Sequence, residues 1–312
     1  MSVPYLHELT LRLALGASNI DPKLVKLHQS WLRSQQATDG GFAGREGGCD
    51  PYYTAFALRA LWVTGALDAE IAAQAGTFLR ARLEQRESII DMISLIFGAA
   101  ICEMSVGEVV IPDVESDSES NWRKNVANLL ESLRTQDGGY AKTPEGRAGS
   151  TYQTFLSVLC YQLIDLPIPE VDRITAFLTA QQHPEGGYLE IRAAKRAGVN
   201  PTAAAIGTLK ALGQLDPANH CNTIEFLAEM QCDEGGLTAN TRIPFADLLS
   251  SFTGLLTLID LQAANQIDQN AIRRYAESMQ SPEGGFYGFA LDQISDVEYS
   301  FYGIATLALC QN

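Results

Sequence analysis

Apolar residues recur at helical spacing in two kinds of segment that alternate along the chain. The first kind is amphipathic, as in VDRITAFLTAQQ, where Ile174, Phe177 and Leu178 share one helical face. The second kind is apolar on most sides and rich in small residues, as in PTAAAIGTLKALG and EYSFYGIATLALC. This alternation predicts helical hairpins, each with an amphipathic outer helix followed by a more buried inner helix.

Glycine pairs follow the amphipathic segments in five places, beginning at Gly40, Gly138, Gly186, Gly235 and Gly284. The last three steps are 48, 49 and 49 residues, and the first is 98, or twice 49. One pair is therefore missing in the stretch LEQRESIIDMISLIFGAA, which keeps the surrounding pattern with a shortened loop. Such a regular period is typical of repeat architectures. We expect each glycine pair to end a first helix with a residue of positive φ.

Six repeats of about 49 residues predict an all-α fold of twelve helices in six hairpins. We expect an α/α toroid (an α6-α6 barrel) that occupies residues 1–312 as a single domain, with the second helices as its inner ring. An open solenoid is the alternative, but solenoids usually carry polar capping repeats, and the sequence shows none. The repeats span approximately residues 20–67, 68–106, 121–166, 168–215, 219–262 and 268–312.

Composition narrows the classes of function. The net charge of −15 argues against a nucleic-acid partner. The sequence has no run of about 18 apolar residues, so we expect no transmembrane segment. The first residues do not resemble a secretory signal. Six scattered cysteines without a CxxC pair are typical of reduced thiols. We therefore expect a cytoplasmic protein.

The repeats resemble those of a known superfamily. Segments such as FLTAQQHPEGGY and FLAEMQCDEGGL are similar to the glutamine-and-aromatic repeats of prenyltransferases and squalene cyclases, from about residue 25 to residue 310. Chain length and six repeats most resemble the β subunit of protein prenyltransferases. The resemblance implies an apolar central cavity that holds an isoprenoid or another apolar small molecule. A partner subunit is compatible with the sequence, which carries no sign of one.

The zinc site of protein prenyltransferases is incomplete in this chain. In that family, segments resembling PFADLLSSFTGLLTL and QISDVEYSFYGIATLAL supply an Asp-x-Cys pair and a histidine as ligands. The matching positions here are Asp247, Leu249 and Tyr299. Zinc needs three or four N, S or O ligands, so we expect neither zinc nor standard protein prenylation. An all-carboxylate site for a hard cation, built from Asp247, Asp296 and Glu298, is the alternative.

The resemblance also implies a diphosphate pocket near the loops of the fourth and fifth repeats. There the chain carries Arg192, Lys195, Arg196 and Arg242, and forked guanidinium groups suit phosphate oxygens. These four residues are therefore candidates for substrate binding, with Mg²⁺ expected only if a diphosphate is bound. A solvated basic loop is the alternative, since the family's histidine is absent.

Class II terpene cyclases offer a second comparison. They protonate an alkene or epoxide with an aspartic acid that an apolar cavity keeps protonated. Their Asp-x-Asp-Asp motif is absent, but Asp50, Asp247 and Asp296 open second helices and are candidate catalytic acids. Helix capping is the alternative explanation, because the residues opening all six second helices are of N-cap type. They are Asp50, Asp91, Ser150, Asn200, Asp247 and Asp296, with prolines at positions 51 and 201 expected to be the first helical residues.

Aromatic residues of the second helices are candidates for lining an isoprenoid tunnel, where their faces would stabilise carbocations. We expect Tyr53, Phe252, Tyr299 and Tyr302 among them, with a purely structural core as the alternative. Three functions stay open: a prenyltransferase-like protein that binds a prenyl diphosphate or terpenoid, an acid-initiated terpene cyclase, and a non-catalytic toroid that binds a lipid or a protein. The resemblance favours the first.

Overall fold

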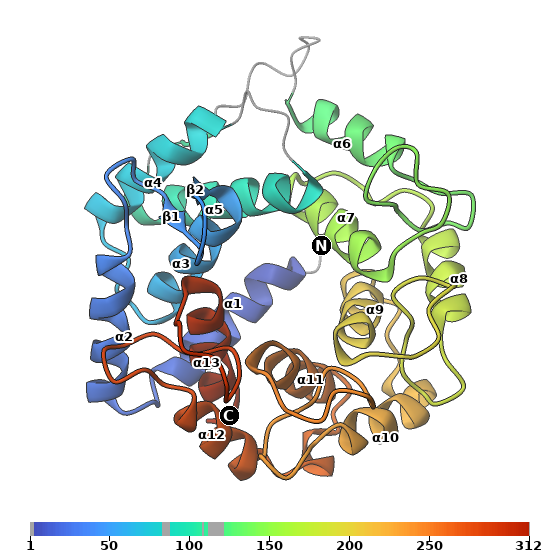
Figure 1. Ribbon diagram of the computed structural model, residues 1–312. Coiled ribbons are helices and arrows are strands. Elements are labelled where there is room, and N and C mark those ends of the chain that lie inside the picture. The colour runs from blue at the N-terminus through green and yellow to red at the C-terminus, as the bar shows by residue number, and fades with distance from the viewer. Residues whose placement is uncertain (1–2, 83–87, 108, 112–121, 312) are drawn as a thin grey trace.

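The computed structural model describes residues 3–82, 88–107, 109–111 and 122–311. Within them, helices form two concentric rings, as expected for an all-α toroid (Figure 1). The inner helices are α3 (Pro51–Val63), α5 (Ile89–Val106), α7 (Thr151–Leu163), α9 (Val199–Ala211), α11 (Leu248–Asp260) and α13 (Val297–Leu309). The outer helices are α2 (Pro22–Ser34), α4 (Ala69–Arg82), α6 (Trp122–Ser132), α8 (Val171–Gln181), α10 (Cys221–Glu229) and α12 (Gln269–Ser278).

One further helix and several short elements complete the described chain. Helix α1 (Tyr5–Ala17), which the repeat pattern did not predict, lies across the axis of the toroid (Figure 1). Strands β1 (Phe42–Ala43) and β2 (Cys49–Asp50) form an antiparallel pair, with Phe42 opposite Asp50. Two 3₁₀ turns, η1 (Pro217–His220) and η2 (Ala264–Gln266), lead into α10 and α12. The shortened loop expected in the second repeat includes residues 83–87, which lie outside the described residues.

The inner helices pack side by side in a closed ring, in which α13 contacts both α11 and α3. Their apolar character follows from burial on both sides, by the outer helices and by their neighbours. Helix α5, with 18 residues, is long and apolar enough to span a membrane by length and composition, which the sequence analysis did not expect. Its place between α3 and α7 in the ring accounts for that apolarity.

Side-chain caps begin most of the inner helices. Asp50 Oδ1 accepts a hydrogen bond of 2.8 Å from the backbone N–H three residues on, and Asp247 and Asp296 cap α11 and α13 in the same way. Ser150 caps α7 through its hydroxyl. These four predicted N-caps are confirmed, and Pro51 is the first helical residue, as expected.

The cap prediction was wrong for α5 and α9. Ser88 caps α5, since its Oγ accepts a hydrogen bond of 3.2 Å from the N–H of Asp91. Gly198 precedes α9, which places Asn200 and Pro201 inside its first turn. The first four N–H groups of a helix have no intrahelical partner, so the ring of Pro201 removes no helical hydrogen bond at this third position.

The glycine pairs do not end the outer helices, which is a second correction. Helix α8 ends at Gln181, and Gly186, with φ of +98°, lies in the turn that follows. A Cβ atom at Gly186 would lie 2.0 Å from the backbone oxygen of Asn222, in the next outer helix. Glycine is required there because the turn of one repeat rests directly on the backbone of the next.

Polar side chains connect these turns from repeat to repeat. Gln231 Nε2 donates to the carbonyls of Gly235 and Asp268, both at 2.9 Å, and its Oε1 accepts from the N–H of Asp268. At the closure, the buried His28 of α2 accepts a hydrogen bond of 3.1 Å at Nδ1 from the N–H of Gly285. Its Nε2 lies 3.1 Å from Gln280 Oε1. The last repeat is thus joined to the first.

We predict that Gly186→Ala destabilises the protein by at least about 2 kcal/mol, because it combines a strained positive φ with a backbone collision. Gly47→Ala is the matched control, since Gly47 has φ of +89° but would place its Cβ in open space. Urea unfolding measures both changes. Equal destabilisation by the two variants would show that the contact with the next repeat is unimportant.

Candidate functional site

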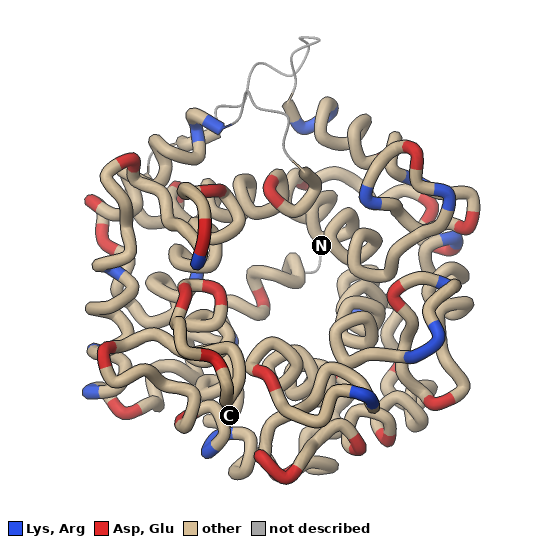
Figure 2. The backbone as a smooth tube through the Cα atoms, in the orientation of Figure 1, with Lys and Arg blue, Asp and Glu red and all other residues tan. Residues whose placement is uncertain are grey.

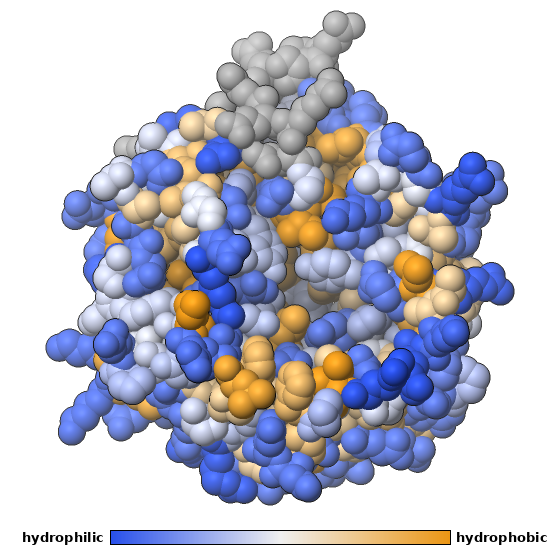
Figure 3. All heavy atoms as spheres, viewed as in Figure 1, coloured by the Kyte–Doolittle hydropathy of each residue, from blue (hydrophilic) through white to orange (hydrophobic). Residues whose placement is uncertain are grey.

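A cavity of about 450 Å³ lies on the axis of the toroid. Figure 3 shows the hollow in the face on which it opens. On α3 it is lined by Tyr52, Ala55, Phe56 and Arg59, which share one face of the helix. The other inner helices contribute side chains at corresponding positions, counted from their own N-caps. The volume falls in the usual range for small-molecule sites, about 300–1,000 Å³.

Three layers follow from this common register. The residues two positions after each cap form the mouth layer. Those five and six positions after it form the middle layer, and those nine positions after it form the deep layer. The mouth layer consists of Tyr52, Ile90, Tyr152, Asn200, Leu249 and Glu298. The middle layer includes Phe56, Phe155, Phe252, Phe301 and Tyr302, and the deep layer includes Arg59, Phe97, Leu159 and Leu256.

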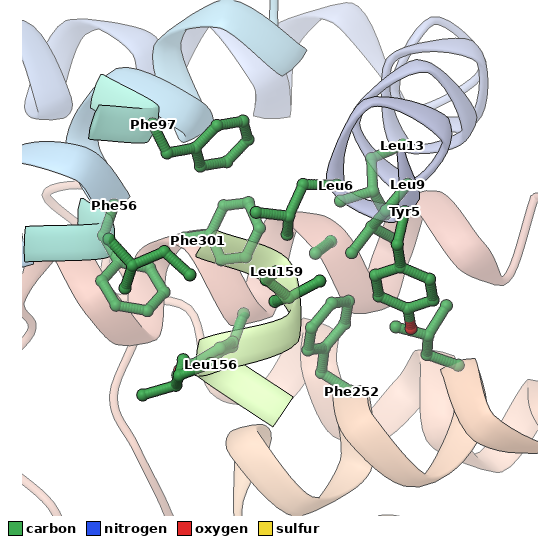
Figure 4. Close-up of a cluster of buried hydrophobic side chains, with 14 of the residues drawn as sticks. Tyr5, Leu6, Leu9, Leu13, Phe56, Phe97, Leu156, Leu159, Phe252 and Phe301 are labelled. Atoms are coloured by element: carbon green, nitrogen blue, oxygen red, sulfur yellow. The ribbon is translucent and has the colours of Figure 1, made fainter. Parts of the chain in front are cut away.

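Helix α1 closes the deep end of the cavity. Its residues Tyr5, Leu6 and Leu9 line the cavity and point toward side chains of the inner helices, Leu159 and Phe252 among them (Figure 4). Because α1 lies at the C-terminal ends of the inner helices, the open end lies at their N-termini. The partial positive charges of helix N-termini therefore surround the mouth.

One buried carboxylate holds α1 in place. The side chain of Asp260, at the end of α11, is 1% exposed. Its Oδ1 accepts hydrogen bonds from Arg12 Nη1 of α1 at 3.0 Å and from Lys210 Nζ of α9 at 2.8 Å. Oδ2 accepts a weaker one from the Tyr5 hydroxyl at 3.3 Å. The closed end of the cavity thus depends on charges carried by three helices.

Glu298 is a carboxyl group that lines the cavity and is held there by two tyrosine hydroxyls. Its Oε1 accepts hydrogen bonds from the hydroxyls of Tyr52, at 2.7 Å, and Tyr302, at 3.3 Å. Burial raises the pKa of Glu298, the tyrosine hydrogen bonds lower it, and the neighbouring charge of Asp296 raises it further. The net pKa is raised. Because both tyrosines bond to Oε1, Oε2 remains for a proton that can be transferred.

Glu190 is a second carboxyl group at the mouth. It comes from the loop between α8 and α9, and its Oε1 accepts a hydrogen bond from the hydroxyl of Ser150. Burial also raises the pKa of Glu190. The mouth therefore carries two carboxyl groups that an apolar environment holds partly toward their neutral forms.

Aromatic rings form the wall between the mouth and the floor. Phe56 and Tyr302 meet edge to face, with centroids 5.3 Å apart, and Phe252 lies 5.8 Å from Phe301. Phe252 and Tyr302, predicted from the sequence to bind substrate, line the cavity. Tyr53 is not among the described lining residues.

The predicted catalytic aspartates lie behind the cavity wall. Asp50, Asp247 and Asp296 act as N-caps, and none belongs to the described lining. Burial raises the pKa of Asp50 and of Asp247. Asp296 Oδ2 accepts a hydrogen bond of 2.6 Å from Arg45 Nε, and Arg45 also lies 5.3 Å from the ring centroid of Tyr299, outside the described lining. A catalytic role for these aspartates stays a prediction, and the carboxyl that faces the cavity is Glu298, two residues after Asp296.

The predicted basic residues lie on exposed loops that precede α9 and α11, outside the described cavity lining (Figure 2). They are Arg192, Lys195, Arg196 and Arg242. Since those loops lead directly into inner-helix N-termini, they belong to the same end of the toroid as the mouth.

The positions that match the family's zinc ligands do not fit a metal. Asp247 is engaged with Ser250, through the backbone N–H at 2.7 Å and the hydroxyl at 2.8 Å. Leu249 offers no ligand atom and faces the cavity. Among the described residues, no group of three or more His, Cys, Asp or Glu side chains could hold a metal ion.

Comparisons with known proteins agree with this architecture. The family model of the prenyltransferase α/α-toroid domain matches residues 18–79 and 202–312, more than half of the chain. The chain belongs to this family. The resemblance inferred from the glutamine and glycine repeats is thereby confirmed. No curated protein matched the chain.

Solved structures with the same fold share little sequence with this family member. Protein geranylgeranyltransferase-I from Candida albicans, complexed with GGPP, has a TM-score of 0.68 at 15% identity, covering 92% of this chain and 91% of that one. A variant of a type II terpene cyclase from Scytonema, in complex with geranylgeranyl dihydroxybenzoate, has a TM-score of 0.62 at 14% identity, covering 98% of both chains. A protein from Actinoplanes has a TM-score of 0.60 at 15% identity, covering 93% of this chain and 98% of that one.

We predict that Asp260→Asn destabilises the protein by about 3 kcal/mol, because it leaves two partly buried cations without their shared carboxylate. Glu8→Gln is the control, since Glu8 also bonds to Lys210 and Arg12 but its side chain is 44% exposed. We expect that control to cost less than about 1 kcal/mol. Chemical denaturation measures both, and equal losses would contradict a special role for Asp260.

Proposed function

We propose that this protein binds an isoprenoid in the central cavity and cyclises it, with Glu298 as the acid that starts the reaction. The observation that carries the proposal is the cavity-facing carboxyl group of Glu298, whose pKa burial raises and whose Oε1 two tyrosines hold. Acid-initiated cyclisation needs a carboxylic acid that stays protonated in an apolar site. The sequence analysis assigned that role to Asp50, Asp247 and Asp296, the last of which caps the helix that carries Glu298.

The reaction begins when the proton on Glu298 Oε2 is transferred to the substrate. It is transferred either to a carbon atom of an alkene or to the oxygen atom of an epoxide. The O–H bond breaks, a bond from hydrogen to the substrate forms, and a carbocation results. Neighbouring double bonds attack the cation and close rings. Loss of a proton from the last cation completes an isomerisation, so no further reactant is needed.

The aromatic wall suits such an intermediate. Phe56, Phe252 and Tyr302 line the space just below the mouth. Aromatic faces attract cations by about 0.5–2 kcal/mol each, and more when water is excluded.

Proteins of the same fold provide support by analogy. One neighbour is a terpene cyclase in complex with geranylgeranyl dihydroxybenzoate, and another is a transferase complexed with GGPP. Both bound molecules carry prenyl chains. A prenyl substrate for the present cavity is consistent with its volume and its apolar lining.

Binding of a prenyl diphosphate is the second candidate function. The four exposed basic residues of the loops before α9 and α11 favour it, because they lie at the open end. Calorimetric titration with farnesyl and geranylgeranyl diphosphate, with inorganic diphosphate as control, tests it. The variant Arg192→Ala/Lys195→Ala/Arg196→Ala should weaken binding if this cluster holds the diphosphate.

For the cyclase, we predict that Glu298→Gln lowers turnover by about 100-fold or more, since general acid catalysis typically contributes that much. Farnesol, geranylgeraniol, the matching carboxylic acids and their terminal epoxides serve as test substrates, with products separated by gas chromatography. Reaction in D₂O should add one deuterium to each product molecule formed by alkene protonation. Glu190→Gln is the matched control, and an equal loss in that variant would contradict the specific role of Glu298.

The same residue predicts a pH dependence. Its raised pKa means that the acid is protonated below that pKa, so the rate should fall as pH rises through it. Stability should follow the same sign, because a carboxyl with a raised folded pKa stabilises the protein at low pH and loses that contribution as pH rises. Glu298→Gln should therefore raise Tm at alkaline pH, with a gain that shrinks as pH is lowered. A rate that stays constant as pH rises through the pKa of Glu298 would contradict the assignment.

A further inference from the structure

Arg59 is a buried cation in the deep layer of the cavity. It lies on α3, in the register of Phe97 and Leu159, and it lines the cavity. Its Nε is buried without a hydrogen-bond partner. Within the described part of the chain, its guanidinium makes neither a hydrogen bond nor an ion pair. Burial lowers the pKa of Arg59 to about 10, so the group is still charged at neutral pH.

Aromatic contacts account for only part of the environment of this charge. The guanidinium carbon lies 4.0 Å from the ring centroid of Phe301, 5.4 Å from that of Phe97 and 5.5 Å from that of Phe56. Buried charges are normally paired, because transfer of an ion from water to an apolar site is expensive. Packing in the deep layer does not require a charged side chain, because Leu159 and Leu256 occupy the corresponding positions of α7 and α11. The unpaired N–H groups therefore point to a ligand.

The charge of the deep layer indicates which ligand. Arg59 is the single Lys or Arg among the described lining residues. One guanidinium in an apolar surrounding matches one negative charge, and its planar fork matches the two oxygens of a carboxylate. A diphosphate carries several charges and would remain largely uncompensated at this depth.

The inference rests on the proposed cyclisation and makes it electrostatically consistent. An unpaired cation in a medium of low dielectric constant raises the energy of a carbocation formed nearby. A carboxylate bound to Arg59 would remove that penalty.

We propose that Arg59 binds the carboxylate of an isoprenoid acid at the closed end of the cavity, so that the apolar chain extends from there toward the mouth. The seven residues from Tyr52 to Arg59 separate the two layers by roughly 10 Å along the helix axis. The chain of the ligand would thus cross the aromatic middle layer, and a double bond near its far end would reach Glu298.

The test compares ligands that differ only at the head group. Binding of geranylgeranoic acid, geranylgeraniol and methyl geranylgeranoate to the full-length protein is measured by calorimetry at neutral pH. We expect the acid to bind about 10- to 100-fold more tightly than the alcohol or the ester, as for a charge-assisted pair. In Arg59→Met, which keeps an unbranched side chain but removes the charge and the N–H groups, the acid should lose this advantage while the alcohol binds as before. Arg59→Lys, which keeps the charge without the fork, should retain part of it.

Each outcome decides the proposal. Equal affinity of the acid and the alcohol for the wild type would overturn it, with or without a folded Met variant, and so would an unchanged preference for the acid in Arg59→Met. If a neutral isoprenoid is converted in a reaction that requires Glu298, and the acid is not preferred, this proposal is overturned while the proposed cyclase function is retained. No binding of any of the three probes would sink both. As an independent readout, Arg59→Met should raise the Tm of the ligand-free protein, and the acid should raise the Tm of the wild type more than that of the variant.

Discussion

A closed ring of six packed helices cannot fill its own centre, and the rest of this structure depends on that constraint. Helix axes pack about 8–10 Å apart, so opposite axes in a ring of six lie roughly 18 Å apart. Each helix with its side chains is about 10–12 Å in diameter, which leaves a space on the axis. The aromatic residues narrow that space without filling it, and a cavity of about 450 Å³ remains. Closure of the ring and the presence of a central cavity are therefore one geometric fact.

The constraint also explains the two ends of the cavity. All inner helices run in the same direction, so their N-termini gather at one end and their C-termini at the other. At the C-terminal end, where partial charges are negative, α1 brings Arg12 toward Asp260 and closes the floor. The N-terminal end stays open and carries Glu190 and Glu298. The proposed acid and the deep cation Arg59 are thus kept in different layers, and a negative ligand group can be bound away from the place where a carbocation forms.

Much of the fold could be predicted from the sequence because the repeat acts at short range. The glycine turns, the caps at Asp50 and Asp247 and the apolar inner segments are local signals, and together they indicated the toroid. The error at the glycine turns came from a contact between repeats. The turn at Gly186 is fixed by the backbone of the next outer helix rather than by the end of its own. Helix α1 belongs to no repeat, so periodicity could not reveal that it closes the cavity.

The site was harder to predict because the cap and the cavity lie on different faces of the same helix turn. An N-cap side chain bends back onto the N–H groups of its own helix, whereas the residue two positions later points to the axis. The sequence analysis named Asp50, Asp247 and Asp296 as candidate acids and considered Glu298 only as a ligand for a hard cation. Asp296 caps the helix on which Glu298 lines the cavity. The same register, carried about two more turns along α3, places Arg59 in the lining of the cavity. An arginine inside the apolar segment YYTAFALRALWV was the available signal, and its meaning became visible only when the cap positions of all six helices were known.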